Sequence, residues 1–168
     1  MAPTPLLTLL QQQLSGCLMQ GTSISESGIT VSTDKLSGEV ILFFRIDTVA
    51  GRSSLGMEDL KVCDCLVFYA TENEQREMLC FLELKAAGLD KAAQQILSVY
   101  RKLKLLLETN RIQLVTLKAC VCMRHQVPLG DLRHANELKR VFGPGNVHLK
   151  FGTKHYKQFG IILRNKTT

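Results

Sequence analysis

Two apolar stretches, Lys61-Val-Cys-Asp-Cys-Leu-Val-Phe68 and Met78-Leu-Cys-Phe-Leu-Glu-Leu-Lys85, decide how this chain is expected to fold. Both have the β-branched and aromatic content of strands, and the polar segment 71–77 separates them, so the pattern predicts a hairpin. Three charged residues, Asp64, Glu83 and Lys85, stand where such strands would otherwise carry Val or Leu. Because burying a charged group costs free energy, we expect these three side chains to serve a function.

Alternation along the strands predicts which side chains lie together. Successive side chains of a strand point to opposite faces, so Glu83 and Lys85 share one face while Cys80 takes the other. If Asp64 lies on the face of Glu83, its two cysteine neighbours, Cys63 and Cys65, must point the other way. The pattern therefore predicts a charged face opposed to a buried layer that contains cysteines, in a sheet covered on both sides.

Helices and further strands flank this hairpin. Thr4 and Pro5 are typical of a helix N-cap and first residue, and the leucines that follow recur at helical spacing as far as Leu18. An apolar stripe predicts a long helix over residues 88–108, and Asp131 is expected to cap another helix that ends before Gly143. The remaining expected elements are strands at 29–32, 40–46, 112–122 and 159–164 and a loop at 50–57. The expected order is α, β, β, β, β, α, β, α, β.

Length and composition are those of one globular domain spanning residues 1–168, with 45% hydrophobic and 21% charged residues. No apolar run approaches the roughly 18 residues of a membrane span, and the start of the chain lacks the features of a signal peptide. Five of the six cysteines lie in apolar runs, where a free thiol behaves as a small core residue. We therefore expect a soluble, cytoplasmic protein without a membrane partner.

The positive charge is concentrated toward the end of the chain. The formal net charge is +6, and residues 139–168 contain seven Lys and Arg but no Asp or Glu. Such asymmetry favours a polyanionic partner, although a basic tail can also be simply a solvated surface.

The chemistry of the three charged residues points to a divalent metal. Two carboxylates brought together repel each other unless a cation lies between them, and Mg²⁺ binds through one or two carboxylates plus water and phosphate oxygens. Asp64 and Glu83 are the candidate ligands, with Mn²⁺ as a substitute ion. A bound divalent ion activates water and stabilises phosphoryl charge, and Lys85 can orient that water. The three residues suit phosphodiester hydrolysis.

Asp64 is followed after eighteen intervening residues by Glu83-Leu84-Lys85, which ends an apolar strand, and a helix with a Gln comes next. The order of these residues resembles the pattern of the PD-(D/E)XK nuclease superfamily. The resemblance covers about residues 40–123. It implies an α/β, restriction-endonuclease-like fold with an αβββαβ core and a mixed central sheet flanked by helices, followed here by a basic helix and strand at 131–166. It also implies that Asp64 and Glu83 bind the catalytic metal and that Lys85 assists the nucleophile.

The chain departs from the family pattern at two places. Cys63 stands where many members have Pro, and the acid that many members carry on the first helix is missing from the stretch between Thr4 and Leu18. Four acidic residues elsewhere are candidates for a further ligand, and the sequence does not choose among them: Glu26, Asp47, Glu58 and Asp59.

Gln95 is the expected companion of the three charged residues. At about 100° per residue, Gln95 flanks the buried stripe of its helix whereas Gln94 points about 160° away from Ile96. Gln95 resembles the Gln that the family carries on this helix as part of its extended site. Lys91 and Lys102 share the flank of Gln95, where they would place positive charge beside a phosphate track.

These expectations describe a Mg²⁺-dependent endonuclease acting on DNA rather than RNA, functioning as a homodimer if it cuts both strands. Candidate nucleic-acid contacts are Lys91, Lys102, Lys150, Lys154, Lys157 and Arg164. Three other interpretations stay open. The charged residues form a plain surface ion pair at a strand end, the chain is an inactive nuclease-fold module that binds nucleic acid or protein, or the substrate is RNA or a branched junction.

Overall fold

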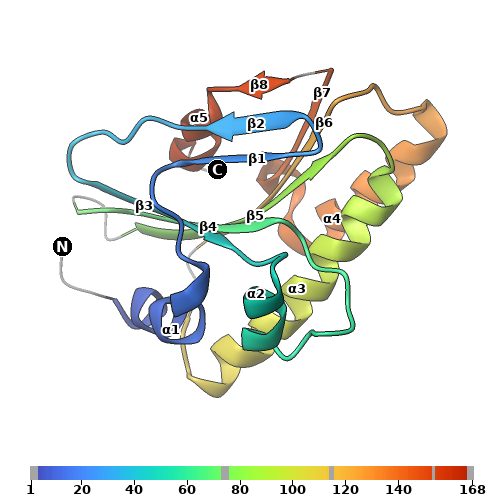
Figure 1. Cartoon of the computed structure of the whole chain (residues 1–168). Coiled ribbons are helices and arrows are strands. Elements are labelled where there is room, and N and C mark those ends of the chain that lie inside the picture. The colour runs from blue at the N-terminus through green and yellow to red at the C-terminus, as the bar shows by residue number, and fades with distance from the viewer. Residues whose placement is uncertain (1–3, 73–75, 114–115, 153, 166–168) are drawn as a thin grey trace.

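A large mixed sheet forms the centre of the protein. The computed structural model describes residues 4–72, 76–113, 116–152 and 154–165, which fold into a mixed α/β architecture (Figure 1). The sheet has five strands, in the spatial order β3 (Glu39–Arg45), β4 (Cys65–Thr71), β5 (Arg76–Lys85), β6 (Thr116–Met123) and β7 (Val147–Phe151). A smaller sheet contains β1 (Ser23–Glu26), β2 (Ile29–Ser32) and β8 (His155–Tyr156).

Strand directions follow from the connections. Strands β3, β4 and β5 are antiparallel neighbours, whereas β5, β6 and β7 run parallel to one another. Helix α3 (Leu89–Thr109) joins β5 to β6, as a parallel pair requires a crossover. Gly88, at φ 93°, is the N-cap of α3 and lies only three residues after Lys85, so the end of β5 and the start of α3 lie close together.

Each face of the large sheet is covered by its own layer. On one face, α1 (Pro5–Gln13), α3 and α4 (Arg133–Phe142) pack against side chains such as Leu66, Phe68 and Phe81. On the other face, the small sheet and α5 (Phe159–Arg164) cover a second core (Figure 1). The prediction of a mixed central sheet covered on both faces is confirmed.

The predicted hairpin, the strands at 29–32 and near 40–46, and the helix at 88–108 are all present. The first helix has Thr4 as its N-cap but ends at Gln13, and a 3₁₀ turn (Ser15–Cys17) follows it. The strand predicted at 112–122 is seen from Thr116, and residues 114–115 lie outside the described part of the chain. Residues 73–75 of the predicted charged loop also lie outside it.

The strand predicted at 159–164 is wrong, because these residues form helix α5. Phe159, Ile162 and Leu163 are buried while Ile161 is 49% exposed, which is the spacing of a helix packed on one side. The terminal strand of the large sheet is instead β7, which the sequence analysis missed.

Two smaller corrections concern a loop and a helix cap. The predicted loop at 50–57 contains a short helix, α2 (Val49–Ser54), whose N-cap Thr48 accepts a hydrogen bond from the amide of Gly51. Asp131 does not cap α4, because it lies in a 3₁₀ turn (Leu129–Leu132) and α4 begins at Arg133 without a side-chain cap.

The cysteine layer is confirmed except for Cys63. The thiols of Cys65, Cys80, Cys120 and Cys122 belong to the core under α5, whereas Cys63 packs in the opposite core, toward α3. Cys63 precedes the first residue of β4, so strand alternation does not govern its direction.

None of the helices in the described residues is both long and apolar enough to span a lipid bilayer.

Candidate active site

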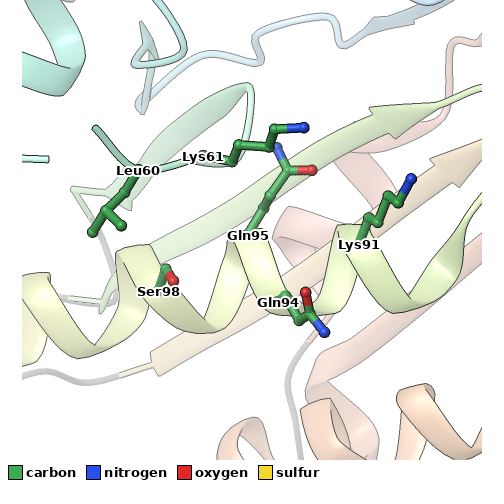
Figure 2. Close-up of a pocket in the computed structure, with 6 residues that line it drawn as sticks. All are labelled: Leu60, Lys61, Lys91, Gln94, Gln95 and Ser98. Carbon is green, nitrogen blue, oxygen red and sulfur yellow. The ribbon is translucent and has the colours of Figure 1, made fainter. Parts of the chain in front are cut away.

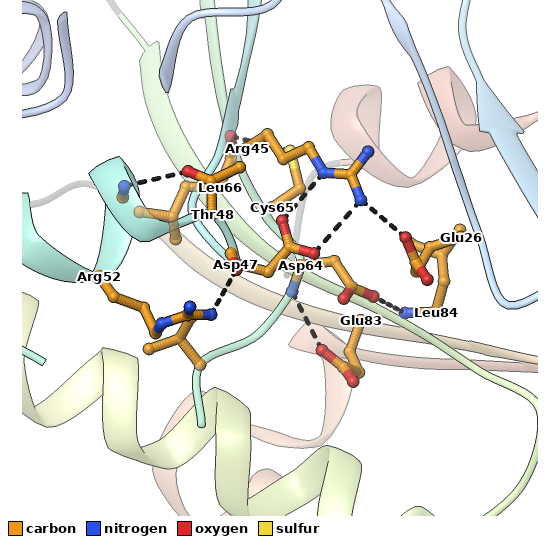
Figure 3. A network of polar contacts seen from close by, with 12 residues as sticks. Glu26, Arg45, Asp47, Thr48, Arg52, Asp64, Cys65, Leu66, Glu83 and Leu84 are labelled. Atoms are coloured by element: carbon orange, nitrogen blue, oxygen red, sulfur yellow. Dashed lines mark hydrogen bonds and ion pairs between the residues drawn. The ribbon is translucent and has the colours of Figure 1, made fainter. Parts of the chain in front are cut away.

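Asp64 and Glu83 lie side by side at one end of the β4/β5 pair. In the antiparallel register Cys65 pairs with Leu82, and Asp64 and Glu83 stand one step beyond that pair. The amide of Asp64 donates to Glu83 Oε2 at 3.0 Å, and the amide of Leu84 donates to Asp64 Oδ2 at 2.6 Å (Figure 3). Each carboxylate is therefore held by the backbone of the other strand. The predicted proximity of the two acids is present in the structure.

Lys85 completes the predicted trio. Its Nζ lies 2.8 Å from Glu83 Oε1, and its side chain is 26% exposed while that of Glu83 is fully buried. The ammonium group thus stands between the buried acid and solvent. In this position it can neutralise Glu83 or, after a small rotation, face an anion that approaches from outside.

Burial makes both acids hard to ionise. Desolvation is the largest effect on each, and it raises the pKa of Asp64 and the pKa of Glu83 above their ordinary values. The charge of Asp64 raises the pKa of Glu83 further, while Lys85 opposes this rise. A divalent cation would relieve the repulsion between two neighbouring desolvated carboxylates.

Gln95 lies where the helical angle predicts. It is buried at 9% exposure, Gln94 is exposed, and Gln95 Nε2 donates to the carbonyl of Val62 at 2.7 Å. Because Val62 is two residues before Asp64, this hydrogen bond ties α3 to the segment that positions the acid. Gln95 is a positioning residue for Asp64, since its carboxamide reaches the Asp64 segment through the backbone.

A pocket of about 360 Å³ opens beside Asp64. Asp47, Glu58 and Asp59 share its wall with Asp64. Three of the four acids that the sequence left open therefore gather in what we call the acidic pocket. The fourth, Glu26, does not line it, but its charge and that of Asp47 raise the pKa of Asp64.

Arg45 organises the nearest of these acids. Its guanidinium lies 2.9 Å from Asp47 Oδ1 and 2.7 Å from Glu26 Oε2, and Arg52 Nη1 donates to the carbonyl of Asp47 at 2.5 Å (Figure 3). The sequence analysis missed Arg45 and Arg52. The available pattern was Arg45-Ile-Asp47, a charged pair at the end of an apolar strand, which repeats the spacing of Glu83-Leu-Lys85.

A second pocket of about 300 Å³ adjoins the acidic pocket, with which it shares Leu60, Lys61 and Gln95. We call it the lysine pocket, because Lys61 and Lys91 both line it; its remaining lining residues are Gln94 and Ser98. Figure 2 shows the carboxamide of Gln95 between the two lysine side chains. The structure thus brings the predicted Lys91 beside the site and adds Lys61, which the sequence analysis did not select.

The other predicted nucleic-acid contacts do not gather here. Lys102, on α3, has its ammonium against Gly56, where an added Cβ would lie 3.4 Å away. Lys150 lies 5.3 Å from the centre of the Tyr156 ring, and Lys154 and Lys157 are exposed at the two ends of β8. These last three belong to the side of the sheet opposite α3.

Arg164 has a structural partner. Its Nε donates to Glu39 Oε1 at 2.7 Å, and this hydrogen bond lowers the pKa of Glu39 to about 2. Arg164 thereby fastens α5 to the first strand of the large sheet.

The acids fit a weakly coordinating divalent ion. Within the described residues, no group of three or more His, Cys, Asp and Glu side chains is arranged to hold a metal. Two carboxylates fit Mg²⁺, which keeps several waters and takes its remaining ligands from substrate phosphates. Asp64 and Glu83 are the two carboxylates that could hold such an ion.

Comparisons with protein-family models, with curated proteins and with solved structures found no match to this chain.

Proposed function

We propose that this protein is a metal-dependent nuclease that hydrolyses phosphodiester bonds in DNA. The observation that carries the proposal is the pair of buried carboxylates of Asp64 and Glu83, each bonded to a backbone amide beside the other, with the ammonium of Lys85 2.8 Å from Glu83. A fold gains no stability from two desolvated acids that lie beside each other, so their presence favours a role in binding a cation.

The strand order supports a restriction-endonuclease-like core. A helix, three antiparallel strands, a crossover helix and a parallel strand follow one another in the chain as α1, β3, β4, β5, α3 and β6. This is the αβββαβ order expected from the resemblance, with the short elements η1, β1, β2 and α2 inserted. Because fold alone does not imply activity, the proposal depends on the site.

Each residue has a separate task in this proposal. Asp64 and Glu83 would hold Mg²⁺, which when bound supplies an activated water and stabilises charge on the phosphoryl group. Lys85 releases Glu83 to the cation and turns its ammonium toward the scissile phosphate. Gln95 keeps the Asp64 segment against α3, so that the two carboxylates stay in register.

A cleavage assay tests the proposal. The purified chain is incubated with supercoiled, linear and single-stranded DNA and with RNA, in Mg²⁺, Mn²⁺ or EDTA. We expect DNA cleavage that requires the metal and is lost in Asp64→Asn and Lys85→Met. Lys104→Met, at an exposed position on α3, is the control and should cut like the unmodified chain. Full activity in either site variant would refute the assignment.

One observation favours an inactive binding module as the second candidate. A backbone amide already bonds each carboxylate and Lys85 lies 2.8 Å from Glu83, so these contacts hold the two acids in place without a cation. If DNA binding is unchanged by EDTA and no metal supports cleavage of any substrate, this second candidate replaces the first.

A further inference from the structure

Gln95 has a polar atom that the fold leaves without a partner. Its Nε2 donates to the carbonyl of Val62, which fixes the orientation of the carboxamide. Gln95 is nine-tenths buried, and its Oε1 is buried and accepts no hydrogen bond from any described residue. An unmet buried acceptor costs free energy, and such a group calls for an explanation.

The surroundings of this oxygen define what it can bind. The carboxamide lies between Lys61 and Lys91 in the lysine pocket, and Leu60, which is 53% exposed, provides an apolar wall (Figure 2). The oxygen requires a hydrogen-bond donor, so a phosphate alone does not satisfy it. The two ammonium groups require an anion. A nucleotide offers all three features, because its phosphate is anionic, its base is flat and apolar on its faces, and its base edge carries N–H donors.

We propose that the lysine pocket binds one unpaired nucleotide next to the scissile phosphate, so that the preferred substrate is single-stranded or frayed DNA. This inference rests on the proposed nuclease function. The acidic pocket would receive the scissile phosphate with its cation, and the neighbouring nucleotide would enter the lysine pocket, since the two pockets share Lys61 and Gln95.

Pairing decides whether a base can reach Gln95. The oxygen has no exposed surface, so a base must enter between the two lysine side chains, which are exposed and can turn toward phosphates. A base inside a duplex is stacked and its pairing edge is occupied by the partner strand. At about 300 Å³, the pocket is at the lower end of small-molecule sites, which suits one nucleotide and not a duplex.

Abasic substitution tests the inference directly. The Lys85→Met chain, which the proposed function expects to bind DNA in Mg²⁺ without cutting it, is titrated into a short fluorescein-labelled DNA strand, and anisotropy is recorded. The strand is compared with its duplex and with versions that carry one abasic residue at each position in turn. We expect tighter binding of the single strand and a loss of about fivefold or more at one abasic position.

Removing the acceptor should remove this dependence on the base. Gln95→Leu, made in the same background, should bind every version of the strand alike, whereas Gln11→Leu on the exposed side of α1 should keep the abasic effect. If Gln95→Leu melts early by circular dichroism, Leu60→Ser at its exposed position takes its place, with the same expected loss.

The outcomes separate this inference from the function on which it rests. Equal affinity for single strand and duplex, or no abasic effect at any position, overturns the nucleotide pocket even if the unmodified chain cuts DNA. An abasic effect that persists in Gln95→Leu shows that the base lies elsewhere and also overturns it. A base-dependent single-strand complex in a chain that cuts nothing refutes the nuclease and retains the pocket as a binding site.

Discussion

Replacing Glu83 by Gln should make the metal-free protein more stable. Gln keeps the shape of the side chain and can still accept the amide hydrogen of Asp64, but it removes a fully buried charge that lies against a second acid. Lys85 loses its partner without becoming a buried charge, because its side chain is 26% exposed and can turn to water. A structural ion pair would behave in the opposite way, since its removal destabilises the fold.

The expected gain follows from the burial of Glu83. Each unit by which the fold raises the pKa of Glu83 corresponds to about 1.4 kcal/mol. Loss of the partly exposed contact with Lys85 costs about 1 kcal/mol. The net gain is about 1–3 kcal/mol at pH 8, and the Tm should rise by about 2–4 °C for each kcal/mol in a chain of this size.

The pH dependence of unfolding gives the sign of this change in stability independently. The pKa of Glu83 in the folded chain is raised above its ordinary value of 4.5, so the unfolded chain loses this proton first as the pH rises. The unmodified protein therefore loses stability from about pH 4.5 upward, and Glu83→Gln loses less, because only the raised pKa of Asp64 still contributes. The difference between the two proteins should be small at pH 5 and grow toward pH 8.

Thermal melts of both chains in EDTA and in Mg²⁺, at pH 5 and pH 8, measure this difference. Mg²⁺ should raise the Tm of the unmodified chain at pH 8 and leave that of Glu83→Gln unchanged. Glu108→Gln, at an exposed position on α3, is the matched control and should change the free energy of unfolding by less than about 0.5 kcal/mol. A clear loss of stability in Glu83→Gln would show that the acid stabilises the sheet and would refute its role as a metal ligand.

Three further predictions concern the frame around the site. Glu39→Gln should lower stability by about 2 kcal/mol at neutral pH, because Arg164 holds the pKa of Glu39 at about 2. This contribution to stability is present above pH 4.5 and is lost as the pH falls toward 2. The loss of stability measured in urea titrations should therefore be smaller at pH 3 than at pH 7. Gly51→Ala should cost about 1–3 kcal/mol in thermal melts, because the added Cβ would lie 2.5 Å from the backbone of Ile46, whereas Gly16→Ala, with no atom within 4 Å, should be neutral or stabilising. Lys118→Met should weaken hydrogen-exchange protection in α5, because its buried Nζ binds two carbonyls of the C-terminal segment at 2.7 Å each; unchanged protection would contradict that role.

The central hairpin was predictable because its residues have one environment throughout. From Cys65 to Ala70 and from Met78 to Leu84 every side chain is buried, so the apolar runs report a sheet covered on both faces. The long helix α3 was equally clear, since its apolar stripe faces the sheet along its whole length.

The C-terminal region was predicted less well because its burial is less regular. Every side chain of β7 is only half-buried, although its sequence, Val147-His-Leu-Lys-Phe151, alternates apolar and polar residues as a strand does. The alternation was therefore available in the sequence and was overlooked. Residues 159–164 contain Phe, Ile and Leu, whose β propensity favours a strand. The structure makes them a helix because only one side of the segment faces the core, and contacts distant in sequence determine which side that is.

The residues of the candidate site also differ in how well the sequence predicted them. Strand alternation predicted that Glu83 and Lys85 share a face, and helical angle predicted Gln95, because both depend only on local geometry. The place of Asp64 beside Glu83 was an assumption that came from the chemistry of paired carboxylates and from the family resemblance. Asp47 and Arg45 could not be selected by spacing alone, since their place beside Asp64 depends on the register between β3 and β4. The charged pair Arg45 and Asp47 was visible in the sequence, whereas its proximity to Asp64 was not.

The arrangement of charge beside the site sets a direction for a bound strand. Four carboxyl groups line the acidic pocket together with only two cationic side chains, Arg52 and Lys61, so the acids outnumber the cations and a metal ion would favour the approach of a phosphate. Ammonium groups of Lys61 and Lys91 line the adjoining pocket, where a phosphate is attracted without any cation. A nucleic acid should therefore enter the lysine pocket first and reach the acids only when metal is present. This division of charge predicts that EDTA weakens nucleic-acid binding only slightly and abolishes cleavage.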